Sequence, residues 1–207
     1  MLGREVESAA IDSTGYENGH TSHYYGRRSG QKKRFFPKIT ALCDTTSYLY
    51  IAAAVSQGPR PDDPEFAPLV RSAFALAPFR RLLADAGFDA EPHHRLVRET
   101  LGAESVIPPT RGRPGKRPPS GRYRSLMARD FPKSAYGQRW QVESCFSQDK
   151  RRFGSAIEGR SYHARCRKLH LRLLVHNMAL LLLSLAAAQK LALHASLFNR
   201  ADLVPFF

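Results

Sequence analysis

The sequence predicts an α/β fold, because three candidate strands come first and are followed by a helix, a strand and a second helix. The 207 residues suffice for one large domain with an extension, and 43% hydrophobic and 10% aromatic residues are typical of folded chains. Short apolar runs separated by turn residues carry the prediction. The candidate strands of the first third lie near 6–11, 35–43 and 47–55.

The first candidate strand, Val6–Ile11, is followed by Asp12 and by the turn-forming residues Ser13-Thr14-Gly15. We therefore expect the strand to present Asp12 at its C-terminal tip. The second and third strands are separated by Asp44-Thr45-Thr46, which favours a hairpin turn.

The middle of the chain alternates helix and strand signals. Asp63 and Pro64 favour a helix start, and Pro78 follows the end of the helix predicted over 64–76. The next strand, 80–84, leads into Asp85 and the turn at Gly87. A helix is expected over 91–101 and a short strand at 106–107.

The last third begins with a segment, 111–124, that has six basic residues, three prolines and three glycines, a composition that predicts a flexible loop. Helices are expected over 136–153 and from about 162 to 190. The apolar run 178–188 is shorter than the ~20 residues of a membrane span, so it is interpreted as a buried core helix. We expect a catalytic core at 1–155 and a helical extension at 156–207.

Charge composition predicts a polyanionic partner, because 32 Lys and Arg against 18 Asp and Glu give a net charge of +14 and a pI near 10.2. The N-terminus has no signal-peptide pattern, and three unpaired cysteines are typical of a reduced compartment. These features predict a cytoplasmic, nucleoid-associated protein without a membrane partner. The basic residues expected to contact DNA phosphates are Arg27, Arg28, Lys32, Lys33, Arg34, Arg111, Arg113, Lys116 and Arg117.

One stripe of the predicted helix over 136–153 carries the chemistry. At 100° per residue, Tyr136, Arg139, Glu143 and Lys150 lie within an arc of about 60°. A solvated helix needs no such stripe, whereas a site that binds phosphates around a metal ion does.

The spacing Tyr-x2-Arg-x3-Glu-x6-Lys resembles the YREK signature of DDE-type insertion-sequence transposases. Ile11-Asp12-Ser13-Thr14-Gly15 resembles the family's first-aspartate strand, and Ala84-Asp85-Ala86-Gly87-Phe88 resembles its second acidic element. The resemblance implies an RNase H-like fold, with a mixed five-stranded sheet flanked by helices and followed by a long C-terminal helix.

The resemblance also implies catalytic roles and cofactors. Asp12, Asp85 and Glu143 would be the catalytic, metal-binding triad, and oxygen ligands favour two Mg²⁺ or Mn²⁺ ions for DNA strand cleavage and strand transfer. Arg139 and Lys150 would bind DNA phosphates, supported by Tyr136. The implied partners are transposon-end and target DNA, and we expect a homodimer when the protein is active.

Some alternatives stay open at this stage. Asp44 and Asp89 compete with the two aspartates, but they are better explained by a hairpin turn and by the cap of the helix that begins near Glu91. Only 11 residues precede Asp12, so we expect a truncated copy or the second half of a split gene. The competing function is a catalytically dead transposase remnant that only binds DNA. A basic protein anchored in a membrane by its Leu-rich helix is a third possibility.

Overall fold

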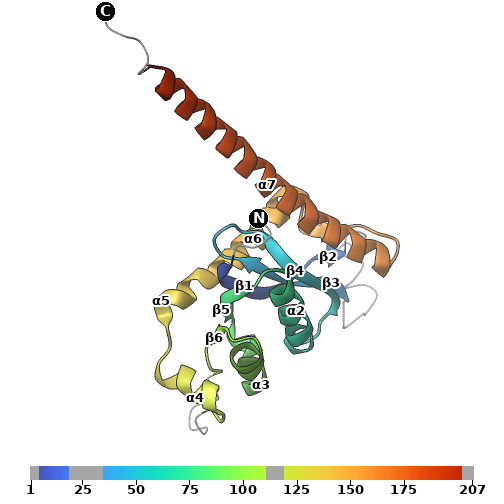
Figure 1. The fold of residues 1–207 in the computed structure, drawn as a ribbon. Coiled ribbons are helices and arrows are strands. Elements are labelled where there is room, and N and C mark those ends of the chain that lie inside the picture. The colour runs from blue at the N-terminus through green and yellow to red at the C-terminus, as the bar shows by residue number, and fades with distance from the viewer. Residues whose placement is uncertain (1–4, 19–34, 111–118, 202–207) are drawn as a thin grey trace, which may run out of the picture.

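The computed structural model describes residues 5–18, 35–110 and 119–201, with side chains as far as residue 192. Its centre is a five-stranded sheet in the order β4-β3-β1-β5-β6 (Figure 1). β1 runs antiparallel to β3 and parallel to β5, β3 runs antiparallel to β4, and β5 runs parallel to β6. The strands of this sheet are β1 (Val6–Gly15), β3 (Phe36–Asp44), β4 (Tyr50–Gly58), β5 (Phe79–Ala84) and β6 (Glu104–Val106).

The first strand is longer than the sequence predicts. β1 continues past Asp12 to Gly15 because its register with β3 is unbroken from Ala9 opposite Asp44 to Gly15 opposite Lys38. Asp12 therefore lies inside a paired strand rather than at its tip, and that expectation was wrong. Beyond the sheet, β2 (Glu17–Asn18) pairs with β7 (Ala156–Ile157).

Helices cover both faces of the sheet. α2 and α3 lie on one face, and α6 and the first part of α7 lie on the other (Figure 1). The α-helices are α2 (Asp63–Leu76), α3 (Glu91–Arg95), α4 (Arg122–Arg129), α5 (Lys133–Tyr136), α6 (Trp140–Phe153) and α7 (Tyr162–Ala201). The tighter or wider helical turns are η1 (Ala86–Phe88), η2 (Leu96–Thr100) and η3 (Gly137–Arg139).

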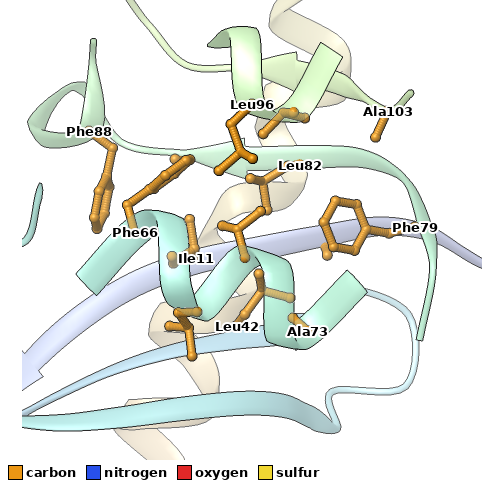
Figure 2. Packing of buried hydrophobic residues seen from close by; sticks show 14 of the residues in the cluster. Ile11, Leu42, Phe66, Ala73, Phe79, Leu82, Phe88, Leu96 and Ala103 are labelled. Carbon is orange, nitrogen blue, oxygen red and sulfur yellow. The ribbon is translucent and has the colours of Figure 1, made fainter. Parts of the chain in front are cut away.

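The core under α2 is built on aromatic packing. Phe66 is fully buried and packs beside Phe88 (Figure 2). The Phe66 ring centroid lies 5.4 Å from that of Phe88 and 3.9 Å from that of His93. Ile11 and Leu82 complete the contact from the sheet. Each such side chain contributes about 1.5–3 kcal/mol through burial, so this layer fixes α2 and η1 against β5.

Alternation along β1 decides which way its side chains point. Ala9 and Ile11 belong to the core under α2, whereas Ala10 belongs to the core under α6 and α7. Successive side chains of a strand point to opposite faces. Asp12 follows Ile11 and therefore projects toward the α6 face. Ala84 of β5 faces α2, so the next residue, Asp85, also projects toward the α6 face.

The segment predicted to be a loop over 111–124 ends in a helix. α4 begins at Arg122 because the Glu91 carboxylate accepts hydrogen bonds from the backbone N–H groups of Tyr123 and Arg124, both at 3.0 Å. Gly121 precedes it with φ +110°. The loop prediction was therefore wrong for 122–124, and residues 111–118 lie outside the described part of the chain.

The apolar run 178–188 was expected to be buried, and that interpretation was wrong. α7 continues past the edge of the sheet, so every residue from 181 to 192 is exposed (Figure 1). Residues 162–192 of this helix are long and apolar enough to span a membrane, with only 11% of the most apolar window buried. The division of the chain at residue 155 stays a prediction.

Candidate active site

Two aspartates occupy neighbouring positions on parallel strands. The β1–β5 ladder ends with Ile11 opposite Ala84, so Asp12 is the next residue of β1 and Asp85 directly follows the end of β5. Adjacent strands lie about 4.8 Å apart, and both side chains project toward the α6 face. The Asp85 carboxylate accepts a 2.9 Å hydrogen bond from the backbone N–H of Gly87, which begins the turn η1.

Gly87 allows the backbone of this turn to lie close to the Asp85 carboxylate. A Cβ at this position would lie 2.9 Å from Oδ1 of Asp85. The next residue, Phe88, is buried against Phe66 and anchors the turn in the core. The Asp-x-Gly-Phe pattern thus has a local physical reason: an acid at the end of β5, a residue without Cβ, and an aromatic anchor.

Helix α6 brings the third acid to the same end of the sheet. Glu143 lies in its first turn, and α6 packs on β1. The Arg139 guanidinium bridges two of the acids, donating to Glu143 at 2.5 Å and to Asp12 at 3.5 Å. Two of the three acids, Asp12 and Glu143, therefore meet at one arginine, although they are far apart in the sequence.

The environment of Asp12 disfavours its negative charge. Burial has the largest effect and raises its pKa to about 6, and the charges of Asp85 and Glu143 act in the same direction. The Ser13 N–H, which donates to Asp12 at 2.8 Å, and the charge of Arg139 only partly oppose the increase. A carboxylate in this state is stabilised by a nearby cation.

Lys150 and Tyr136 complete the predicted stripe. The Lys150 ammonium donates to the Thr14 hydroxyl at 2.6 Å and lies 5.1 Å from the centre of the Tyr16 ring. Burial lowers the pKa of Lys150. The Tyr136 ring lies 5.7 Å from the Arg139 guanidinium. The 3₁₀ turn η3 separates α5 from α6, so the predicted helix is continuous only from Trp140.

A hollow of about 450 Å³ is lined by Asp12, Glu143 and Lys150, whereas Asp85 and Arg139 are not among its lining residues. It is more polar than a core cavity, because acids, bases and hydroxyls share its wall. Its lining residues are Asp12, Ser13, Thr14, Glu143, Phe146, Ser147, Lys150 and Arg151. Sequence analysis did not single out the Thr14 hydroxyl or Arg151.

The three acids do not form a preformed metal site. Within the described part of the chain, no three His, Cys, Asp or Glu side chains are grouped so that they could hold a metal ion. Arg139 instead occupies the space between Asp12 and Glu143. The predicted DNA-contacting residues within 27–34 and 111–117 lie outside the described residues.

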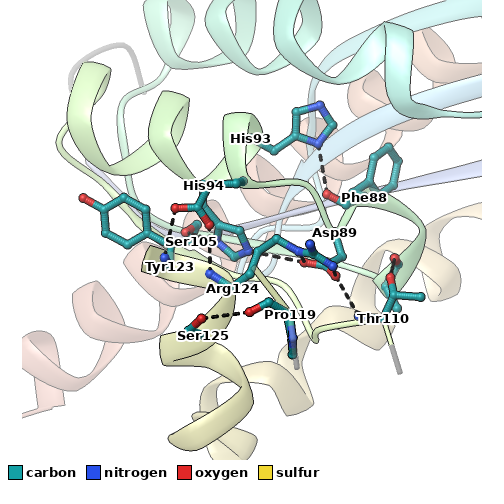
Figure 3. Close-up of polar contacts among 12 residues, drawn as sticks. Phe88, Asp89, His93, His94, Ser105, Thr110, Pro119, Tyr123, Arg124 and Ser125 are labelled. Atoms are coloured by element: carbon teal, nitrogen blue, oxygen red, sulfur yellow. Dashed lines mark hydrogen bonds and ion pairs between the residues drawn. The ribbon is translucent and has the colours of Figure 1, made fainter. Parts of the chain in front are cut away.

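The competing aspartates have other partners. Asp44 accepts hydrogen bonds from the backbone N–H groups of Thr46 and Ser47 and so stabilises the hairpin turn. Asp89 does not cap α3; it accepts two hydrogen bonds from Arg124, at 2.9 and 2.7 Å, and one from the Thr110 N–H (Figure 3). It therefore ties α4 to the core rather than joining the acidic cluster.

A buried polar network on the other side of α6 was missed. His176 of α7 donates to Asp149 through Nδ1 at 2.7 Å and to the Tyr48 carbonyl through Nε2 at 3.1 Å. The Tyr50 hydroxyl donates to the same carboxylate at 2.8 Å. The interruption of the Leu-rich run by His176-Asn177 was the available signal, since polar residues in an apolar helix need buried partners.

The mixed five-stranded sheet flanked by helices and followed by a long C-terminal helix defines an RNase H-like fold. The catalytic core domain of BIV integrase matches with 14% identity and a TM-score of 0.43, covering 84% of this chain and 82% of that chain. The piggyBac transposase, solved as a synaptic complex with hairpin DNA, matches with 10% identity and a TM-score of 0.53.

A family model described as the transposase DDE domain matches residues 7–178. The chain therefore belongs to the transposase DDE domain family. The match to the piggyBac transposase covers 90% of this chain but only 49% of that chain, so this chain spans about half of its length. No curated protein matches the sequence.

Proposed function

We propose that this chain is the catalytic core of an insertion-sequence transposase of the YREK group, which cuts and rejoins DNA phosphodiesters. Asp12, Asp85 and Glu143 are the proposed catalytic residues. The observation that carries the proposal is the register of β1 and β5, which sets two aspartates side by side beneath the helix that bears the glutamate.

The donor set fits a hard divalent cation. Three carboxylates supply only oxygen ligands, and the raised pKa of Asp12 reflects burial and mutual repulsion that a cation relieves. Two bound Mg²⁺ or Mn²⁺ ions would activate a water or a 3′-hydroxyl and stabilise the leaving oxygen. Ion binding requires the acids to draw together and Arg139 to leave the space between Asp12 and Glu143.

The basic residues of the stripe would hold the DNA backbone. Arg139 has five N–H donors in a planar fork, so a phosphate can replace the carboxylates as its partner. Lys150 offers a point charge at the rim of the same hollow, positioned by Thr14. The Tyr136 ring supports the Arg139 guanidinium. Transposon-end and target DNA are the proposed partners, and the active form is proposed to be a homodimer.

Substitution Glu143→Gln tests the proposal. It removes one carboxylate charge but keeps the shape, so nicking of supercoiled plasmid in Mg²⁺ or Mn²⁺ should be lost while plasmid binding in a gel-shift assay stays within a few fold. Glu99→Gln is the control, because Glu99 pairs with Arg95 on an exposed helical turn away from the site. Cation-dependent nicking by Glu143→Gln at the wild-type rate would refute the assignment.

One observation favours a second candidate, a remnant that binds DNA without cutting it. The described acids do not form a three-residue metal group, and an arginine already neutralises two of them. A wild-type protein that shifts plasmid DNA in a salt-dependent manner but leaves it intact in both Mg²⁺ and Mn²⁺ would support this alternative.

A further inference from the structure

Helix α7 has two apolar faces on opposite sides. Leu169, Leu173 and His176 are buried against the sheet and α6. At 100° per residue, a second apolar stripe lies about 180° away from this buried face and fills an arc of about 100°. Its members are Leu171, Leu174, Val175, Met178, Leu182 and Leu185, with exposed fractions from 46% to 64%. The helix is thus built to pack on something besides its own sheet.

Other exposed apolar residues surround the helix where α7 leaves the body of the protein. From residue 181 to 192 every side chain is exposed, including Leu183 at 61% and Leu191 at 72% (Figure 1). Folded monomers rarely expose contiguous apolar surface of this kind. The sequence from 162 to 201 also contains no acidic residue, and the 17 residues 173–189 contain no Lys or Arg.

A membrane does not fit this stretch well. The first part of the uncharged run is already engaged, because Leu173 and His176 are buried in the protein and Asn177 bonds to the backbone of Tyr50. The free uncharged part, 178–189, has 12 residues and a length of about 18 Å. The hydrocarbon core of a bilayer is about 30 Å thick.

We propose that the exposed stripe binds the same helix of a second copy of this chain, in antiparallel orientation. The stripe has a heptad pattern with Leu171, Met178 and Leu185 at one core position and Leu174, Leu181 and Ala188 at the other. These three heptads span about 30 Å. Since the stripe carries no charge, the stripes of two copies can pack against each other without burying an unpaired ion.

Residue size and charge favour the antiparallel arrangement. It places Leu171 against Ala188 of the partner helix at the ends and Met178 against Leu181 at the centre, so large residues meet small ones where the helices diverge. A parallel pair would instead set the basic cluster Arg165, Arg167 and Lys168 against its own copy. The antiparallel pair separates these clusters and opposes the helix dipoles favourably.

Self-association of the full chain tests this interface. Sedimentation equilibrium in detergent-free buffer should show a dimer at micromolar protein, and Leu185→Glu should weaken it at least ~100-fold, because each dimer then buries two uncompensated carboxylates. Leu183→Glu is the matched control: Leu183 is 61% exposed and Leu185 is 60%, but Leu183 lies off the stripe. The control should stay within a few fold of wild type.

Disulfide trapping tests the orientation. In a Cys166→Ser background, oxidising a mixture of Leu174→Cys and Leu185→Cys chains should yield the mixed disulfide, while Leu174→Cys alone should stay uncrosslinked.

A monomer at 100 μM or so, an equal effect of both glutamate variants, or co-flotation of monomer with anionic phospholipid vesicles would overturn the interface. The homodimer belongs to the proposed function, but these measurements use neither DNA nor cations, so the two proposals fail separately.

Discussion

The buried network around Asp149 should make the stability of the protein depend on pH, and Asp149→Asn should remove that dependence. Burial, the largest influence on His176, lowers its pKa, but its hydrogen bonds to Asp149 and Cys145, the Asp149 charge and the Tyr48 carbonyl together raise the pKa to about 9. Both ring nitrogens face acceptors, so the protonated ring satisfies them both.

The sign and size follow from linkage. The ordinary pKa of His176 is 6.5, and at 1.36 kcal/mol per pH unit the increase corresponds to about 3 kcal/mol. This stabilisation is complete below pH 6.5, where both the folded and the unfolded chain are protonated, and is lost as the pH rises through 9. Removing the Asp149 carboxylate removes its charge and its hydrogen bond to His176, the largest of the influences that raise this pKa.

Urea unfolding at several pH values measures the effect. The free energy of unfolding of wild type minus that of Asp149→Asn should be about 3 kcal/mol larger at pH 6 than at pH 10. Titrating groups that contact neither Asp149 nor His176 are shared by both proteins and cancel in the difference. Glu99→Gln, which breaks an exposed ion pair with Arg95, should cost less than about 1 kcal/mol at every pH. A difference for Asp149→Asn that does not change between pH 6 and 10 would contradict the reasoning.

Two further substitutions test the turn at α4 and the charge of the acidic cluster. Gly121→Ala should destabilise the protein by about 1–3 kcal/mol in thermal unfolding, since φ is +110° and the new Cβ would collide with the Glu91 carboxylate; Gly137→Ala, which meets nothing within 4 Å, should be neutral or stabilising. Asp12→Asn should raise the melting temperature in divalent-free buffer at pH 7, because it deletes a charge that burial disfavours, and added Mn²⁺ should stabilise wild type but not the variant. A lower melting temperature for Asp12→Asn, or an equal response of both proteins to Mn²⁺, would argue against that account.

The strands and helices of the core could be predicted because their signals are local. Apolar runs bounded by turn residues predict β3, β4 and β5 to within a few residues, and the Asp63-Pro64 start predicts α2. The extension of β1 to Gly15 could not be predicted, since it depends on pairing with β3, more than twenty residues away. The pairing with β3 holds Ser13 and Thr14 in an extended strand despite their local preference for a turn.

The candidate site was predictable in part, through the helical spacing of its stripe. Spacing gives the shared face of Arg139, Glu143 and Lys150, but not that Arg139 also reaches Asp12 on β1. Such contacts depend on how α6 crosses the sheet, which no local pattern encodes. The prediction that residues 178–188 are buried failed for a related reason. An apolar run has the same composition whether it packs on its own chain or on a second copy.

The three acids lie on elements that are held in place in different ways. Asp12 is held by ladder bonds within a central strand, whereas Asp85 begins a short turn and Glu143 is carried by a helix that is attached to the sheet by side-chain packing. Any tightening of the cluster would therefore come from the second and third acids moving toward a stationary first. Spin labels on α6 and on β3 would report that approach as a shortening of one distance while the spacing between β1 and β3 stays constant.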